Sequence, residues 1–251
     1  MGSGYYAALS GLLARTQALN AVANNIANSS TTAYKAQAQF YQALDAGDGA
    51  NVVPGLGPLN QAVNAYGVLG GASLDWAQGQ IARTGNPLDL ALEGRGFFVA
   101  QTAAGVRYTR DGSLHLSPKG VLLTAAGDPV LNPKGKPLQL PPGPVAISPD
   151  GVISAEGATV GQIAVVGFAP GTAFTPHGNS YFAVPAGTKP VPAPQTQVQQ
   201  GSLERSNLSP VQGMVSLIEI QQTAELLQKA LSSFNQQFDL PAASELPTVQ
   251  P

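Results

Sequence analysis

The sequence predicts an α+β protein: a helix at each end of the chain contributes to a coiled-coil-like layer, and a mostly antiparallel β domain is inserted between the two helices. Three observations support this fold class. Apolar residues recur every three or four positions near both ends, and strand-like segments separated by turn residues fill the middle. The 251 residues also include 29 glycines and 21 prolines, a proportion that favours many tight turns.

The first predicted element is a helix over residues 4–28. Its apolar positions alternate in steps of four and three, which places them on one seam of a helix. The seam consists of Tyr5, Leu9, Leu12, Thr16, Leu19, Ala23 and Ile26. Residues 1–44 are thus interpreted as a helix followed by a loop, and the Gly- and Pro-rich residues 45–58 as a linker.

Three asparagines stand near the end of this helix: Asn24, Asn25 and Asn28. Asparagine has poor helix propensity, but its amide both donates and accepts hydrogen bonds. These residues therefore suit a helix end that packs against a neighbouring subunit. A plain helix stop followed by a turn explains them as well.

The middle of the chain, residues 59–184, is predicted to be a β domain, and residues 60–184 are expected to fold without the chain ends. Strand patterns cover 88–92 (half-buried), 97–100, 106–110, 114–116, 160–168 and, as the last strand, 181–184. Asp111-Gly112 predicts a hairpin between 106–110 and 114–116. Further turns are expected at 118–120, 126–128 and 149–151.

The chain then passes through a Pro- and Gln-rich segment, residues 185–205, which is interpreted as a second linker. Residues 206–239 contain the second predicted helix, with Ser209 as N-cap and Pro210 in the first turn. Its seam consists of Leu217, Ile220, Ala224, Leu227, Leu231, Phe234 and Phe238. The tail, residues 240–251, has three prolines and no periodicity, so we expect it to be disordered.

Both predicted helices carry few charges. From Ser209 to Gln237 the charged residues are Glu219, Glu225 and Lys229. A solvated amphipathic helix normally has a charged face. Small, uncharged faces suit packing on several sides, either against the protein's own domain or between subunits.

Composition and motifs exclude several classes of function. The chain has no cysteine, and its 12 basic and 14 acidic residues offer no surface for nucleic acid. No run of 18 apolar residues could span a membrane, and the N-terminus lacks the features of a cleaved signal peptide. No nucleophile elbow, phosphate-binding loop or dinucleotide motif is present, so we expect no catalytic residues and no cofactor.

The remaining candidates for chemistry have ordinary structural explanations. The two histidines, His115 and His177, have no ligating neighbours in sequence, so no metal site is expected. The acidic residues Asp75, Asp89 and Glu93 could form a glycosidase pair but are better explained as surface and turn carboxylates. The basic residues interpreted as the solvated edge of a hairpin are Arg107, Arg110 and Lys119.

Four segments, taken together and in order, resemble the signatures of bacterial flagellar rod and hook proteins. They are residues 24–35 (NNIANSSTTAYK), 86–98 with 108–113 (NPLDLALEGRGFF and YTRDGS), 201–207 (GSLERSN) and 214–219 (MVSLIE). The resemblance extends from about residue 5 to residue 238. Within the family, the chain length, the short first linker and the PLDLAL segment are most similar to the proximal rod protein, and next to the distal rod protein.

This resemblance implies a structural axial subunit of the basal-body rod and not an enzyme. Such a subunit is exported unfolded by the flagellar type III apparatus without a cleaved signal and lies in the periplasmic space. Residues 1–44 and 206–239 would be its inner rod domain, with the β domain outside. Its partners would be copies of itself and other rod and hook proteins, joined through the terminal helices into a tubular drive shaft that transmits torque.

The residues expected at the assembly interface are Leu9, Leu12, Leu19, Asn24, Asn25, Ile26, Asn28, Leu217, Ile220, Leu227, Leu231 and Phe234. The alternative function is a secreted β-domain adhesin or carbohydrate-binding module that oligomerises through its terminal helices. Among the departures from the family pattern, Ala33 stands where the family generally has glycine. A left-handed turn there would cost alanine energy, or else the loop differs.

Overall fold

The computed structural model describes residues 3–42, 68–178 and 180–244, and side chains are described for residues 9, 11–38, 73–178 and 180–233. The predicted linker at 45–58 lies outside these residues. The chain forms two units. We call residues 3–27, 37–42, 68–73 and 210–244 the helical unit, and residues 28–36 and 74–209 the β unit.

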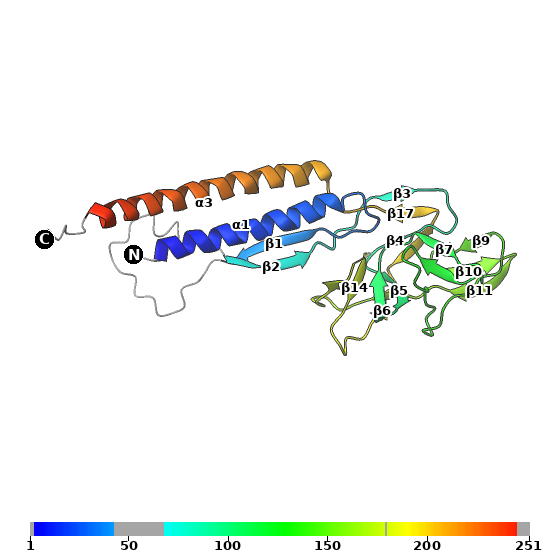
Figure 1. The fold of residues 1–251 in the computed structure, drawn as a ribbon. Coiled ribbons are helices and arrows are strands. Elements are labelled where there is room, and N and C mark those ends of the chain that lie inside the picture. The colour runs from blue at the N-terminus through cyan, green and yellow to red at the C-terminus, as the bar shows by residue number, and fades with distance from the viewer. Residues whose placement is uncertain (1–2, 43–67, 179, 245–251) are drawn as a thin grey trace. The chain divides into compact units, whose positions relative to one another are not determined.

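The helical unit contains α1 (Ser3–Ala27), α3 (Pro210–Ser244), β1 (Gln37–Gln42) and β2 (Val68–Leu74). Strands β1 and β2 pair with each other, and α1 contacts both α3 and β1. Figure 1 shows the two helices running antiparallel, with α1 between α3 and the paired strands. Both predicted helices are confirmed, but the pairing of residues 37–42 with 68–74 was not predicted.

Helix α3 continues five residues into the segment that we expected to be disordered, because it ends at Ser244 and not before residue 240. It passes through Pro241. Proline fixes φ close to the helical value and deletes one backbone donor. The remaining residues of the tail, 245–251, lie outside the described residues.

The β unit contains fifteen strands among its described residues, in antiparallel pairs. The strands are β3 (Ile81–Arg83), β4 (Leu90–Glu93), β5 (Phe97–Thr102), β6 (Gly105–Thr109), β7 (Leu114–Leu116), β8 (Leu122–Thr124), β9 (Val145–Ile147), β10 (Val152–Ala155), β11 (Ala158–Gln162), β12 (Val165–Gly167), β13 (Thr175–Pro176), β14 (Tyr181–Ala183), β15 (Val191–Pro192), β16 (Gln197–Gln200) and β17 (Ser202–Glu204). The largest sheet has the order β13-β14-β6-β5-β12-β15. A second sheet has the order β11-β10-β9, and three further pairs are β16-β4, β17-β3 and β7-β8.

Strand β5 separates two apolar cores of the β unit. Phe98 belongs to the larger core, with residues such as Leu90 and Ile153, while Phe97 and Val99 belong to the smaller core. Successive side chains of a strand point to opposite faces, so consecutive residues of β5 serve different cores. The strand therefore has no solvent-facing side over Phe97–Ala100, all of which are buried.

The predicted hairpin at Asp111-Gly112 is wrong. Strand β6 pairs with β5 and β14, whereas β7 pairs with β8. Asp111 accepts hydrogen bonds from the backbone N–H and the hydroxyl of Ser113, and the Gly112 carbonyl accepts one from the Leu90 N–H. The segment thus forms a connection between sheets, and the turn at 118–120 makes the real hairpin of β7 and β8.

Two other strand predictions also need correction. The single strand expected over 160–168 is broken into β11 and β12, and at the break the backbone N–H groups of Ile163 and Ala164 donate to the carbonyls of Gly151 and Leu131. Strand β4 was expected to be half-buried, yet its residues 90–92 are all buried. Alanine at position 91 is small enough to be covered on the face that was expected to meet solvent.

The segment interpreted as a linker, residues 185–205, contains β15, β16 and β17, so 181–184 is not the last strand. Each of these strands pairs with an earlier one: β12, β4 and β3 respectively. Proline is tolerated in β15 because this strand is at the edge of its sheet. The fragment 60–184, which we expected to fold alone, lacks all three strands and residues 28–36 of the same unit.

Candidate functional site

The predicted seam of α3 is covered by other parts of the same chain. Ala224 and Leu227 are buried, while Leu217, Ile220 and Leu231 are half-buried. These positions follow one another in steps of three and four, so they share one face. Because Leu227 is only 5% exposed in a single chain, its burial requires no second subunit. The side chain of Phe234 lies outside the described residues.

Helix α1 buries a different face from the predicted one. Its buried positions are Gly11, Ala14, Ala18 and Asn25. On the predicted seam, Leu9 is exposed and Leu12, Leu19 and Ile26 are half-buried. Large apolar residues defined the seam in the sequence, whereas the positions covered in the structure hold mostly small residues.

Asn25 hydrogen-bonds in both directions, as predicted, but its partner is the chain's own backbone. Its Nδ2 donates to the Gln37 carbonyl and its Oδ1 accepts from the Gln37 N–H, each at 2.9 Å. The amide thus joins the end of α1 to the first residue of β1. Asn24 is exposed, and Asn28 forms a turn in which its carbonyl accepts from the Thr31 N–H.

A cluster of three buried charges lies in the β unit. Glu204 is fully buried, and each carboxylate oxygen meets one cation at 2.7 Å: Oε1 accepts from Lys35 Nζ and Oε2 from Arg110 Nε. Glu204 Oε1 also accepts from the Gly79 N–H at 2.9 Å. The three side chains come from the segment after α1, from the end of β6 and from β17. We call this group the charge cluster.

Arg110 corrects one of our predictions, because it is buried and does not belong to a solvated edge. Its Nη1 donates to the carbonyls of Gly94 and Gly96 at 2.8 Å, and its Nη2 donates to the Leu92 carbonyl at 3.1 Å. Asp89 is likewise buried and not on the surface. Lys119 is exposed, as expected.

Burial lowers the pKa of Lys35, and the hydrogen bond and charge of Glu204 oppose that shift. Removing a cation from water is costly unless a carboxylate and further acceptors surround it. Lys35 has such surroundings, since its Nζ also donates to the Ala77 carbonyl at 2.7 Å. The cluster therefore holds two cations only because Glu204 is present.

Asn207 joins three stretches of backbone, those that contain Lys35, Ala77 and Glu204. Its Oδ1 accepts from the Ala36 N–H at 2.9 Å, and its Nδ2 donates to the Asp75 carbonyl at 2.8 Å. Nearby, a Cβ atom added to Gly79 would lie 1.9 Å from the Arg205 carbonyl oxygen. The backbone is therefore closely packed where three segments meet, at 33–36, 75–80 and 204–207. The first of these follows α1 in the sequence, and the last precedes α3.

Ala33 adopts a left-handed conformation with φ of 55° and is fully buried. Its N–H donates to the Glu204 carbonyl at 2.8 Å. The loop therefore keeps the positive φ that a glycine would favour and bears the cost of the alanine side chain. Of the two alternatives left open by the sequence, the strained turn is the one observed.

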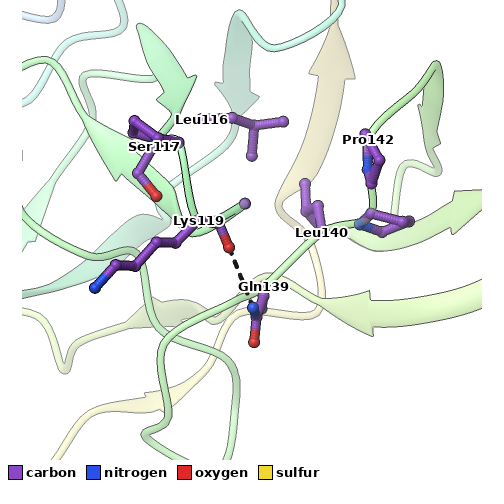
Figure 2. A pocket seen from close by; sticks show the side chains of 9 residues that line it. Leu116, Ser117, Lys119, Gln139, Leu140 and Pro142 are labelled. Carbon is purple, nitrogen blue, oxygen red and sulfur yellow. Dashed lines mark hydrogen bonds between the residues drawn. The ribbon is translucent and has the colours of Figure 1, made fainter.

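No grouping of residues for chemistry is found in the described part of the chain. His115 and His177 are exposed, and no cluster of three His, Cys, Asp or Glu residues could hold a metal ion there. None of the described helices is long and apolar enough to cross a membrane. A hollow of about 640 Å³ next to Lys119 and Gln139 is shown in Figure 2, and Gln139 Nε2 donates to the Lys119 carbonyl there. Lys119 is the one charged residue that lines it.

Sequence reasoning missed the charge cluster because its members are far apart in the chain. Lys35 and Glu204 are separated by 169 positions. Both residues stand in the segments that resemble family signatures, which was the one available signal. No periodicity or spacing links them to Arg110.

Three family descriptions match the chain. The flagella basal body rod protein family matches residues 6–35, the flagellar hook protein FlgE/F/G D1 domain matches 91–155, and the flagellar basal body rod FlgEFG protein C-terminal domain matches 199–239. The second and third matches include Arg110 and Glu204, and the first ends at Lys35.

Curated relatives match over nearly the whole chain. The flagellar basal-body rod protein FlgF of Caulobacter vibrioides is 34% identical over 235 residues, covering 93% of this chain and 94% of the relative. FlgF of Mesorhizobium japonicum is 34% identical, with 93% and 95% covered. The rod protein FlgG of Agrobacterium fabrum is 30% identical, with 90% and 93% covered.

Proposed function

This chain belongs to the family of flagellar basal-body rod proteins and is a structural, FlgF-like subunit of the basal body, and from that premise we propose how it assembles. Its two terminal helices polymerise, in coiled-coil-like contacts, with copies of itself and with other rod and hook proteins. The resulting tube acts as a drive shaft that transmits torque. The chain reaches the rod in the periplasmic space through the flagellar type III export apparatus.

One observation carries this proposal: the chain ends pair as helices that leave apolar side chains outside their own packing. Among the described side chains of α1 and α3, Leu227 is the one large apolar residue that is buried. Leu13 is 59% exposed and Leu226 is 65% exposed. Exposed apolar faces of this kind are typical of surfaces that meet another protein.

The expected interface residues fall into two groups. Leu227 and Asn25 are buried, so we propose that they shape the helical unit itself. The others remain candidates for contacts between subunits, at the exposed or half-buried positions Leu9, Leu12, Leu19, Asn24, Ile26, Asn28, Leu217, Ile220 and Leu231. Phe234 is proposed on its sequence pattern alone.

The test is a deletion of the gene in the source bacterium, complemented by a copy with an epitope tag in the β unit. We expect deleted cells to lack rods and to be non-motile, and complemented cells to swim. The tagged chain should copurify with basal bodies and keep the first turns of α1, as mass spectrometry of its N-terminal peptide would report. Intact rods in the deleted cells would contradict the proposal.

A further inference from the structure

A second apolar face of α3 lies opposite the face that packs within the chain. Its members are Val211, Met214, Val215 and Ile218, each more than half exposed. They are spaced by three, four and seven positions, so they form one stripe on the helix. With 3.6 residues per turn, this stripe lies about half a turn around the helix from Ala224 and Leu227. We call it the outer stripe.

The outer stripe contains no charged residue. Glu219 stands to one side of it, and Glu225 and Lys229 follow after it ends. Four exposed, branched or long apolar side chains in succession are unfavourable for a face that meets only water. None of these four residues belongs to the seam that the sequence indicated, so the outer stripe is a separate feature of the helix.

Helix α1 also has an uncharged outer face, opposite its buried Ala14 and Ala18. That face contains Leu9, Leu13, Thr16, Asn20 and Ala23, all exposed. The Thr16 hydroxyl donates to the Leu12 carbonyl at 2.9 Å, so this polar group has a partner within the helix. Arg15 is the one charged residue of α1, and it lies off this face.

We infer that the outer stripe of α3 docks on the outer face of α1 in a second copy of this chain. The inference rests on the proposed function and specifies which surfaces meet. Thr16, Asn20 and Ala23 of the α1 face are smaller than the side chains of the stripe, so the stripe can fill the space beside them, as in the packing of ridges into grooves. Both faces are uncharged along their length, so neither leaves a charge buried in the contact.

The two faces are different surfaces of one chain, which decides the type of assembly. Contact between unlike patches is heterologous, and each added copy presents a fresh outer stripe and a fresh α1 face. Such contacts build rings or helical arrays. Contact of one outer stripe with another would instead be isologous and would stop at a dimer.

The absence of cysteine in the chain makes this arrangement directly testable by cross-linking. Cysteines are introduced singly at Val211, Val215 or Ile218, singly at Leu9, Leu13 or Ala23, and in pairs with one from each set. The variants are expressed in deleted cells that regain motility, and a short bismaleimide is applied to basal bodies isolated from them. Val160→Cys, at an exposed apolar site in the β unit, is the matched control.

At least one pair should give a ladder of cross-linked oligomers, while chains with a cysteine in the outer stripe alone, and the Val160→Cys control, should remain monomeric on denaturing gels. Dimers from Ile218→Cys alone would overturn the inference in favour of contact between two stripes. Absence of cross-links at every position in basal bodies from motile cells would overturn it as well. In both cases the chain would still be a rod subunit, so the two failures are distinguishable.

A second measurement separates docking from folding. The double variant Val215→Asn/Ile218→Asn should keep the helical circular dichroism and melting of the wild type but weaken concentration-dependent association at least tenfold in sedimentation. The corresponding control is Val106→Asn/Val160→Asn, at exposed positions of the β unit. Equal association of the stripe variant and the wild type would overturn the inference.

Discussion

The β unit and the helical unit differ in where their large apolar side chains lie. In the β unit, large side chains such as Phe98, Leu122 and Ile153 have no exposed surface. In the described part of the two terminal helices, the buried positions are mostly glycine and alanine, and large side chains such as Leu13 and Leu226 face outward. The β unit thus covers its own large apolar side chains, whereas the helical unit leaves apolar surface exposed, which supports the proposal that other chains pack there.

Charges show the same contrast. The β unit buries a glutamate between two cations and satisfies each of them with further hydrogen bonds. The two helices carry few charges, and none of them lies within the outer stripe or the outer face of α1. We expect the buried ion cluster to favour a single arrangement of the β unit, whereas uncharged helix faces can be packed from more than one side.

The largest effect is expected from removing the carboxylate of the charge cluster. Glu204→Ala leaves Lys35 and Arg110 buried without their counter-charge, which costs about 3 to 5 kcal/mol. The single tryptophan, Trp76, lies in the β unit, so its fluorescence reports melting of that unit. We expect the melting temperature to fall by roughly 10 °C, given about 2 to 4 °C per kcal/mol for a domain of this size.

The matched control for this variant is Glu93→Ala, at an exposed glutamate in β4. Surface substitutions usually change stability by less than about 0.5 kcal/mol. A Glu204→Ala protein that melts like the control would show that the charge cluster does not hold the β unit together. The helical signal at 222 nm serves as an independent readout of the other unit.

Two adjacent leucines of α3 allow a buried position and an exposed position to be compared within one helix. Leu227 is buried and Leu226 is 65% exposed. Leu227→Asp should destabilise the helical unit by about 3 to 5 kcal/mol, because it removes apolar contacts and buries an unpaired charge. Leu226→Asp should leave the unit's melting, followed at 222 nm, within about 0.5 kcal/mol of the wild type. Trp76 fluorescence should be unchanged in both variants, and equal loss of helix in the two would contradict the assigned faces.

High pH should affect the β unit selectively. Burial raises the pKa values of Tyr34, Tyr108 and Tyr181, so the folded unit keeps protons that the unfolded chain loses above about pH 10. Stability therefore falls as pH rises through that range. The lowered pKa of Lys35 has the opposite effect on stability. Below about pH 10.5 the unfolded lysine binds its proton more tightly than the folded one, so this group makes stability rise with pH.

Three tyrosines lower the stability as pH rises and one lysine raises it, so we expect a net loss of stability from about pH 9 to about pH 11.5. Thermal melting followed by Trp76 fluorescence measures this loss. Tyr181→Phe removes one of the three groups and should make the decline shallower. A decline as steep as that of the wild type would exclude Tyr181 as a contributor. This variant also removes the hydrogen bond from the tyrosine hydroxyl to Asp128, so only the slope with pH is compared.

The smallest effect is expected at Ala33. Replacing Ala33 with glycine removes the strain of the left-handed conformation, which is about 1 to 2 kcal/mol. Glycine also raises the conformational entropy of the unfolded chain, which lowers the free energy of unfolding by roughly 0.4 to 1 kcal/mol. Ala33→Gly should therefore raise the melting temperature of the β unit by about 1 to 3 °C. Ala36→Gly, at a buried alanine whose φ is not positive, should lower it. A lower melting temperature for Ala33→Gly would indicate that the buried methyl group outweighs the strain.

By itself, the sequence determined the two terminal helices, because their three- and four-residue repeats depend only on local geometry. It also indicated the turns at 118–120, 126–128 and 149–151, where Gly120, Gly127 and Gly151 all have positive φ. The three segments that carry Lys35, Arg110 and Glu204 resembled family signatures, and the family followed from them. These properties require no knowledge of which distant residues meet.

Only the tertiary structure decided which helix face is buried, which strands pair and where the charges lie. Small residues such as Ala14 and Ala18 carry almost no signal in a pattern of large apolar residues, yet the fold buries them. Asp111-Gly112 satisfies the local rule for a hairpin, but β6 gains its partners from β5 and β14. Lys35 and Glu204 form an ion pair across 169 positions, and a contact of that kind is created by the fold and leaves no periodicity in the chain.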